Sequence, residues 1–279
     1  MTNPIVDPFV EVPDTNASSD LVTVEATPSG AVLVTLNKPQ RKNAFDAELI
    51  AAMGEAFETL GSADGQRVVF LRGAGGMFSA GADLDWMRAA AGYSERENRD
   101  DAYEMAKMLK ALWDIPALTV ALIEGGAFGG GAGVVSACDW AVAPAGAKFS
   151  FSEVRLGLIP GTISPYVVGA IGKRHARALF ATGKVFDAAY AEKIGLVSEV
   201  VADAAEPDAV QARIAREILA CGPEAVADSK RLVDDMAFRP IDHALMDESA
   251  RRIARARVRD EGQEGVRAFL EKRKPGWAV

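Results

Sequence analysis

Gly-Gly-Met-Phe-Ser-Ala-Gly-Ala-Asp-Leu at residues 75–84 and Gly-Gly-Ala-Phe-Gly-Gly-Gly-Ala-Gly at residues 125–133 are the segments that decide the fold. Each follows a short apolar run with the character of a buried strand, residues 68–71 and 118–123. Small residues after a strand let a ligand approach bare backbone N–H groups. Two such places can aim two N–H donors at one oxygen, an arrangement called an oxyanion hole. The pattern therefore indicates chemistry at a carbonyl group.

Two simpler interpretations compete with this one. Either glycine-rich segment can be no more than a turn. The glycines of residues 126–131 also have the spacing of a dinucleotide-binding fingerprint. That fingerprint belongs to the first strand–helix turn of its fold and needs an acidic residue about twenty positions later to bind the ribose. The segment meets neither condition, so a Rossmann fold is disfavoured.

Composition narrows the class of protein. The chain has 279 residues and a formal net charge of −8, which argues against nucleic-acid binding. Two cysteines, Cys138 and Cys221, do not make a disulfide framework, and we expect both to be buried in a protein of the cytoplasm. The two histidines, His175 and His243, lack metal-ligand spacing, so we expect no metal site and no Ser-His-Asp triad.

The chain divides into three parts. Residues 1–19 read as a flexible arm without the features of a signal peptide, residues 20–200 as the α/β core, and residues 201–279 as a helical region. No stretch approaches the ~20 apolar residues that span a membrane. In the core, strand, strand and helix patterns recur, which favours stacked ββα units over one doubly wound sheet. Beyond Lys173, strand patterns nearly vanish.

The predicted elements can be given by residue ranges. Strands are expected at 21–25 and 31–36 (a hairpin), 67–71, 117–123, 139–143 and 148–151, and helices at 46–60, 94–113, 187–194, 206–221, 224–236, 243–258 and 262–272, with a small-residue helix after residue 133. Four arginines crowd the helix at 243–258, and a fifth follows it directly: Arg251, Arg252, Arg255, Arg257 and Arg259. They form either a solvated face or a cationic rim for a phosphate-bearing ligand or a partner subunit.

Glu153 is the best candidate for acid–base chemistry. It lies between two apolar segments, residues 149–151 and 156–160. Apolar surroundings raise the pKa of a carboxyl group, so that it can exchange protons near neutral pH. The alternative is a structural role, as a salt bridge to Arg155 or a helix-end cap.

The chain resembles the crotonase family, the enoyl-CoA hydratases and isomerases, in motifs that occur in the family's order and spacing. They are Asn37-Lys38-Pro39 to Asn43-Ala44-Phe45, residues 78–84, residues 126–131, Cys138-Asp139, Phe151-Ser152-Glu153, residues 157–160 and residues 191–197. Together they span about residues 20–275. The resemblance implies an α/β fold, a crotonase-like superhelix of stacked ββα turns with a C-terminal helical trimerisation region.

The resemblance also implies the site. The substrate is a coenzyme A thioester and no separate cofactor is needed, since coenzyme A is part of the substrate. The backbone N–H groups of Ala82 and Gly130 hold the thioester oxygen, and Glu153 is catalytic. The other implied substrate-binding residues surround the coenzyme A and the acyl group: Arg41, Lys42, Ala44, Ala80, Asp83, Leu84, Phe128, Gly133 and Gly161. The N–H of Gly161 is expected to help to hold water, by analogy alone.

The chain departs from the family pattern at Gly133, where enoyl-CoA hydratases usually have a second glutamate. Glu124 is not a substitute, since it precedes the glycine run. We expect Gly133 to leave extra room beside the β carbon of the acyl group, into which a branched acyl group would fit. A single carboxylate must then do the work of two.

A narrower resemblance links the chain to bacterial methylglutaconyl-CoA hydratases. It rests on residues 78–87, on residues 152–155 with 163–165, and on residues 261–265 with 269–273. Such a substrate has a distal carboxylate, for which Arg155 is a candidate partner, although a structural pairing of Arg155 is the alternative.

The sequence leaves three hypotheses for the function. The first is a hydratase that adds water to a branched or dicarboxylic 2-enoyl-CoA. The second is an enoyl-CoA isomerase, for which one glutamate suffices. The third is a catalytically silent protein that binds coenzyme A or RNA on the same scaffold. We expect a homotrimer or a dimer of trimers, with no nucleic-acid or membrane partner.

Overall fold

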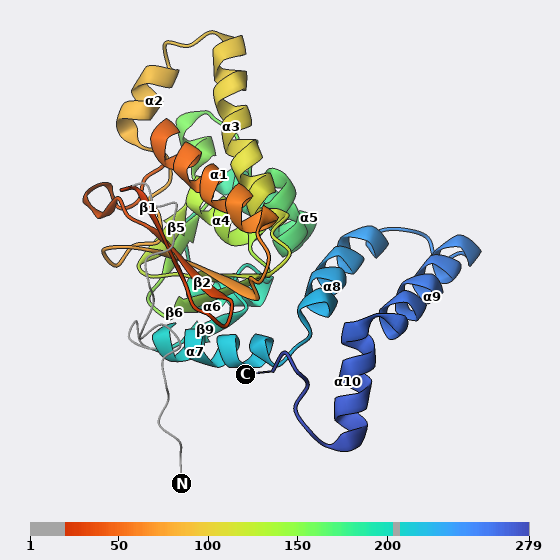
Figure 1. Cartoon of the computed structure of the whole chain (residues 1–279). Coiled ribbons are helices and arrows are strands. Elements are labelled where there is room, and N and C mark those ends of the chain that lie inside the picture. The colour runs from red at the N-terminus through yellow and green to blue at the C-terminus, as the bar shows by residue number, and fades with distance from the viewer. Residues whose placement is uncertain (1–19, 203–206, 279) are drawn as a thin grey trace.

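The computed structural model describes residues 20–202 and 207–278 (Figure 1). The predicted flexible arm at residues 1–19 lies outside them. The strands are β1 Val22–Ala26, β2 Ala31–Leu36, β3 Val68–Gly73, β4 Leu118–Leu122, β5 Gly126–Phe128, β6 Trp140–Pro144, β7 Lys148–Ser150, β8 Phe186–Asp187 and β9 Glu199–Val201. The helices are α1 Ala47–Ser62, α2 Leu84–Ala90, α3 Glu95–Trp113, α4 Gly130–Ala137, α5 Ser164–Thr182, α6 Ala188–Ile194, α7 Pro207–Leu219, α8 Pro223–Met236, α9 His243–Val258 and α10 Asp260–Glu271, with 3₁₀ turns η1 Pro39–Arg41 and η2 Glu153–Leu156.

Two sheets form the body of the molecule. The larger has the order β1-β2-β3-β4-β6-β9, and the smaller has the order β5-β7-β8. Only the β1–β2 and β7–β8 pairs are antiparallel in these sheets. The chain passes from the larger sheet to the smaller one and back, because β5 follows β4 and β7 follows β6. These are the stacked strand–strand–helix turns that the sequence predicted.

Alternate residues of the large sheet face two different cores. Val32, Val69 and Ala121 belong to the main core, which they share with α1, α3 and α4. Their neighbours in sequence, such as Leu33 and Phe70, face the opposite side and pack against α7. This alternation follows from the period of two in a strand. Both faces of the sheet are therefore covered, as a mainly parallel sheet requires.

The local predictions are confirmed where the sequence carries a clear signal. The hairpin pairs Val24 with Val34. The carboxylate of Asp46 accepts a hydrogen bond from the N–H of Leu49 at 3.0 Å and starts α1. Ser94 and Glu97 form a reciprocal capping box at the start of α3. Each device satisfies N–H groups that a helix start leaves without partners.

Other predictions were wrong. Two strands, β8 and β9, follow Lys173, and they are too short to show a periodic pattern. Helix α5 was not anticipated, and it is bent at Gly172, which has a positive φ of 72°. Cys221 is exposed rather than buried, and Cys138 is half-buried.

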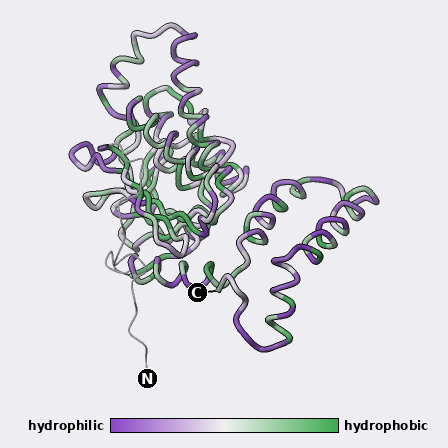
Figure 2. The backbone as a smooth tube through the Cα atoms, viewed as in Figure 1, coloured by the Kyte–Doolittle hydropathy of each residue, from purple (hydrophilic) through white to green (hydrophobic). Residues whose placement is uncertain are grey.

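The C-terminal helices differ in how they meet the body. Helix α7 covers the large sheet, while α8, α9 and α10 project away from it (Figure 1). The Nζ of Lys230 on α8 ties this projection to the body, since it donates to the carbonyl oxygens of Ile115 and Ala117 at 2.7 Å and pairs with Asp139 at 2.6 Å. The boundary at residue 200 stays a prediction. Figure 2 shows hydrophobic residues concentrated in the body and interspersed with hydrophilic ones along the projecting helices.

Within residues 20–202 and 207–278, no helix is both long and apolar enough to cross a membrane.

Candidate active site

The two glycine-rich segments meet in space. We call residues 75–84 the first loop and residues 125–133 the second loop. Ser79 and Ala127 form a parallel β-bridge, in which the N–H of Phe128 donates to the carbonyl oxygen of Ser79 at 3.1 Å. A Cβ placed on Gly81 would lie 2.9 Å from the carbonyl oxygen of Phe128. Glycine at residue 81 therefore permits a close backbone approach that no other residue would allow.

The N–H of Ala82 points away from Phe45. Residue Phe45 bridges to Ala82 by donating to the carbonyl of Gly81 at 2.7 Å and accepting from the N–H of Asp83 at 2.8 Å. In a parallel bridge of this kind the central residue turns its own N–H to the opposite side. The N–H of Ala82 donates to no acceptor within residues 20–202 and 207–278.

The second donor stands at the start of a helix. Gly130 is the first residue of α4, so its N–H has no partner inside the helix. It also has none elsewhere in the described parts of the chain. The partial positive charge of a helix N-terminus adds to the attraction for an anion. Ala82 and Gly130 thus have the free N–H groups that an oxyanion hole requires.

Buried polar groups hold the first loop in place. The Oγ of Ser79 donates to the carbonyl of Asn43 at 2.8 Å and accepts from the N–H of Gly81 at 3.2 Å. The side-chain amide of Asn43 donates to Met77 at 2.6 Å and Ala74 at 3.0 Å. Ser79 and Asn43 are fully buried. Their role was not predicted, although a serine and an asparagine beside glycine-rich turns are common turn-fixing residues.

Glu153 lies against the second loop. A Cβ on Gly129 would come within 3.3 Å of its Oε1, and the same Cβ would be 4.0 Å from the Cα of Gly81. Its Oε2 is buried and has no hydrogen-bond partner. Burial raises the pKa of the Glu153 carboxyl above its ordinary value, against a smaller opposing effect of a hydrogen bond from its own N–H.

The first structural alternative for Glu153, a salt bridge to Arg155, does not hold. It makes no ion pair with Arg155. The Nε of Arg155 instead donates to the carbonyl of Gly183 at 2.7 Å, at the end of α5. This is the structural pairing that the sequence left open for Arg155. A buried carboxylate oxygen without a partner is costly, and this cost is typical of a group reserved for chemistry.

The expected extra room at Gly133 is absent. A Cβ on Gly133 would lie 2.1 Å from Cγ2 and 2.6 Å from Cβ of Ile163. The Ile163 side chain, which is buried, therefore occupies this space. The prediction failed because the two residues are thirty positions apart, so their fit is a matter of tertiary packing. A glycine inside a helix indicates a closely packed neighbour, but the sequence does not show which residue that neighbour is.

The expected role of Gly161 is also contradicted. Its N–H donates to the carbonyl of Ile159 at 2.8 Å. The donor is thus already engaged within its own turn and is not available to hold water in this conformation.

Most of the remaining predicted residues lie in or near the first loop, and Phe128 lies in the second. Arg41, half exposed, pairs with Asp85 at 2.9 Å and approaches Asp83 at 4.0 Å. Leu84 is exposed, Ala44 is buried, and Lys42 is exposed with a left-handed backbone. Ala80, half-buried, donates its N–H to the carbonyl of Lys42 at 2.9 Å. Phe128 is half-buried at the end of β5.

Asp83 has a structural task that the sequence did not reveal. Its carboxylate accepts from the N–H groups of Asp85 and Trp86 and starts α2. Burial alone would raise its pKa, but these hydrogen bonds and the charges of Arg41 and Lys38 hold the pKa of Asp83 below its usual range. The side chain is therefore a helix cap.

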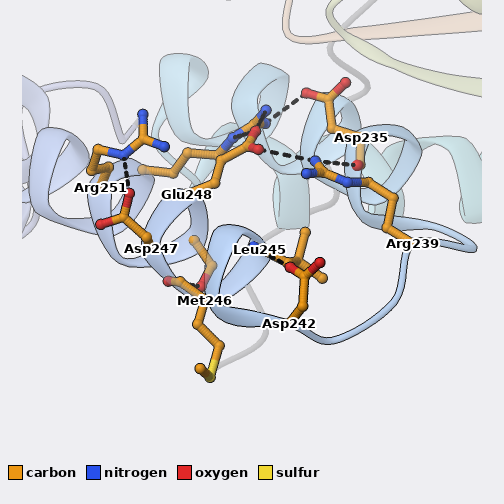
Figure 3. A network of polar contacts seen from close by, with 10 residues as sticks. Asp235, Arg239, Asp242, Leu245, Met246, Asp247, Glu248 and Arg251 are labelled. Atoms are coloured by element: carbon orange, nitrogen blue, oxygen red, sulfur yellow. Dashed lines mark hydrogen bonds and ion pairs between the residues drawn. The ribbon is translucent and has the colours of Figure 1, made fainter.

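The arginine-rich helix is engaged mainly with acidic neighbours. Arg251 pairs with Asp247 at 3.0 Å (Figure 3). Arg252 pairs with Asp235 and Glu248 at 2.6 Å. Arg259 pairs with Asp228 at 2.5 Å. These contacts support the solvated-face interpretation for those arginines.

Comparisons with known proteins agree with this geometry. The chain belongs to the enoyl-CoA hydratase/isomerase family, whose model matches residues 26–279. It resembles a solved structure from Legionella pneumophila assigned to the enoyl-CoA hydratase/isomerase (crotonase) group, with 42% identity, a TM-score of 0.87, and coverage of 92% of this chain and 98% of that one. A Thermus thermophilus protein described as an enoyl-CoA hydratase is 30% identical over 254 residues, 90% of this chain and 99% of the relative.

A further relative bears on the narrower prediction. Human mitochondrial methylglutaconyl-CoA hydratase is 31% identical over 251 residues, which are 88% of this chain and 73% of the relative. Together these findings confirm the crotonase fold and membership of the enoyl-CoA hydratase/isomerase family, whose members act on acyl-CoA thioesters.

Proposed function

We propose that the protein is a hydratase that adds water across the double bond of a branched or dicarboxylic 2-enoyl-CoA, such as 3-methylglutaconyl-CoA. The observation that carries the proposal is the position of the buried Glu153 carboxylate. Its buried Oε2 has no hydrogen-bond partner, and its Oε1 lies beside Gly129, the residue directly before the free N–H of Gly130. A proton-accepting group next to an oxyanion hole is what conjugate addition to a thioester needs.

The reaction can be written with one carboxylate. Glu153 takes a proton from water while the water oxygen bonds to the β carbon. The electron pair of the double bond moves toward the thioester oxygen, where the N–H groups of Ala82 and Gly130 stabilise the enolate. Glu153 then returns the proton to the α carbon. Each donor to the enolate oxygen contributes about 3 kcal/mol in comparable sites.

A second function is favoured by the apolar packing at Gly133. Ile163 fills the space there, so no second carboxylate or bulky polar group stands in its place. A double-bond isomerase needs only one carboxylate, which takes a proton from one carbon and returns it to another. Turnover in water enriched in heavy oxygen separates the two functions, since only hydration adds the label to the product.

The silent binding protein is the least supported candidate. Its acidic composition disfavours RNA, and an unpaired buried carboxylate is not needed for binding alone. A salt-sensitive gel shift with RNA would revive this candidate.

We also propose a homotrimer or a dimer of trimers in the cytoplasm. The projecting helices expose large apolar side chains, among them Phe238, Ile241 and Phe269, the last 82% exposed. Exposed apolar residues in this number indicate a surface that another chain covers. Light scattering coupled to size-exclusion chromatography measures the state directly.

The decisive test is an ultraviolet assay with 3-methylglutaconyl-CoA and crotonyl-CoA side by side. We expect the conjugated enoyl absorbance to disappear faster with the glutaconyl thioester. Loss of absorbance with neither substrate would contradict the hydratase proposal.

A further inference from the structure

The carboxylate of Glu153 is not held by polar contacts to other side chains. Its Oε2 has no hydrogen-bond partner. In the part of the chain that the structure describes, only its own backbone N–H donates to the carboxylate. Glu153 is the first residue of the turn η2. The position of the carboxylate therefore depends on how this turn is attached to the rest of the molecule.

The turn is attached at the carbonyl group of Gly183, which caps the C-terminal end of α5. The Nε of Arg155, two residues after Glu153, donates to this carbonyl oxygen at 2.7 Å. The Oγ of Ser150, three residues before Glu153, donates to the same oxygen at 3.2 Å. An arginine suits this place because its positive charge meets the negative end of the helix dipole. The segment that carries Glu153 is thus fastened to α5 on both sides of the carboxylate.

The same attachment reaches the second loop. Ser150 is fully buried, and its backbone carbonyl oxygen accepts from the N–H of Gly129 at 2.9 Å. Gly129 directly precedes Gly130, the second of the two free N–H donors. The contacts of Ser150 therefore set the turn of Glu153 and the start of α4 in a fixed relation to each other.

We propose that Arg155 is a positioning residue that holds Glu153 against the second loop through the carbonyl group of Gly183. Arg155 makes no ion pair with Glu153, so it acts through the placement of the turn. This inference rests on the proposed function, in which Glu153 transfers the proton.

Hydrogen exchange in butanoyl-CoA tests the positioning without hydration. In deuterium oxide, Glu153 takes a proton from the α carbon as the enolate forms, exchanges it with solvent and returns a deuteron, which NMR detects. Arg155→Met should lower the maximal exchange rate about 10- to 100-fold, because small displacements of a reacting group are this costly. The KM should change little. Arg155→Lys should recover most of the rate, since the contact uses one N–H and not the guanidinium fork.

Matched variants separate positioning from loss of stability. A Cβ on Gly183, which has a φ of 53°, would lie 3.1 Å from Cγ of Arg155. Gly172 in α5 also has a positive φ, 72°, but open space around it. Both alanine variants carry backbone strain, but only Gly183→Ala should lower the exchange rate. Arg67→Met removes a buried guanidinium that donates to backbone carbonyl oxygens at the end of α7, and it should lose stability while keeping the rate.

A further variant keeps the test conclusive if Gly183→Ala fails to fold. Ser150→Ala removes the other donor to the carbonyl oxygen of Gly183. It should lower the exchange rate in the same direction as Arg155→Met but by less, since Ser150 is uncharged and its contact is longer.

The outcomes separate this inference from the proposed function. An unchanged exchange rate in Arg155→Met, or an equal loss in Arg67→Met, would overturn the positioning role. A rise in KM confined to glutaconyl thioesters would also overturn it and would make Arg155 the partner of the substrate carboxylate. Exchange that depends on Arg155, in a protein that hydrates no 2-enoyl-CoA, would support the positioning role and contradict the hydratase. A wild-type protein that neither exchanges nor hydrates would contradict both.

Discussion

In the first loop the backbone is held by hydrogen bonds from buried side chains, while in the second loop it is held by the absence of side chains. Ser79 and Asn43 fix the first loop through their polar groups. In the second loop, Gly126 and Gly131 pack where any Cβ would overlap a neighbouring atom. Each loop presents one N–H to the site. The comparison teaches that two different devices can fix a backbone donor equally well.

The largest expected effect is on Glu153, the acid–base group that stands against the second loop. Glu153→Gln keeps the shape but removes the proton acceptor. We expect kcat to fall by roughly 10²- to 10⁴-fold, with little change in KM. The matched control is Glu124→Gln, which changes a carboxylate just before the second loop. Turnover of Glu153→Gln near the wild-type rate would remove Glu153 from the mechanism.

The raised pKa of Glu153 predicts two pH dependences. The acid limb of kcat/KM should lie above pH 4.5, the ordinary value for a glutamate, because the base works only when ionised. The folded state also binds the proton more tightly than the unfolded chain, so the contribution of Glu153 to stability is lost as pH rises through its folded pKa. Glu153→Gln should therefore gain thermal stability relative to wild type as pH increases from 4.5. A pH-independent difference in Tm would argue against a raised pKa.

Alanine at selected glycines should break the second loop more readily than the first. In Gly126→Ala, the new Cβ would meet the backbone carbonyl oxygen of Lys148 at 2.3 Å, so we expect a loss of about 3 kcal/mol or more. Gly76 has a positive φ of 72° but open space around it, so its alanine variant should lose about 1–2 kcal/mol. Gly146→Ala, with neither constraint, is the control. Urea denaturation ranks the three, and equal losses would refute the distinction between the loops.

Ser79→Ala should destabilise the first loop by removing its buried hydrogen bonds. It leaves the N–H of Gly81 and the carbonyl of Asn43 without their buried partner, at a cost of about 1–3 kcal/mol. Because Gly81 directly precedes Ala82, kcat should fall as well. Ser136→Ala, which removes a buried hydroxyl bonded only within α4, should have a smaller effect on both. If Ser136→Ala lowered stability and kcat more than Ser79→Ala, the special role of Ser79 in the first loop would be contradicted.

The smallest expected effect is at Asp83, where the first loop becomes α2. Asp83→Ala removes the cap and should cost about 1 kcal/mol. Asp83→Asn retains an acceptor oxygen and should recover most of that loss. Helix α2 has no buried residues, so the change should appear as faster amide exchange confined to this helix. Faster amide exchange throughout the body of the molecule would indicate that Asp83 stabilises more than helix α2.

Sequence reasoning succeeded where the signal was local. The cap at Asp46, the hairpin and the apolar setting of Glu153 each depend on a few adjacent residues. It failed where the outcome depends on distant partners. The volume beside Gly133 is set by Ile163, and the N–H of Gly161 is engaged by a tight turn that no motif reveals. Strands of two or three residues, such as β8, are paired because a neighbouring strand is already in place, which no local pattern encodes.

The proposed oxyanion donors are backbone groups, and this affects how the protein can change over time. A substitution replaces a side chain but leaves the N–H of Ala82 or Gly130 in position, provided the loop keeps its path. The part of the site that is proposed to hold the thioester oxygen is thus protected from most mutations, whereas the side chain of Glu153 is not. New acyl specificities can arise on this scaffold by exchanging a few side chains, without rebuilding the chemistry at the carbonyl.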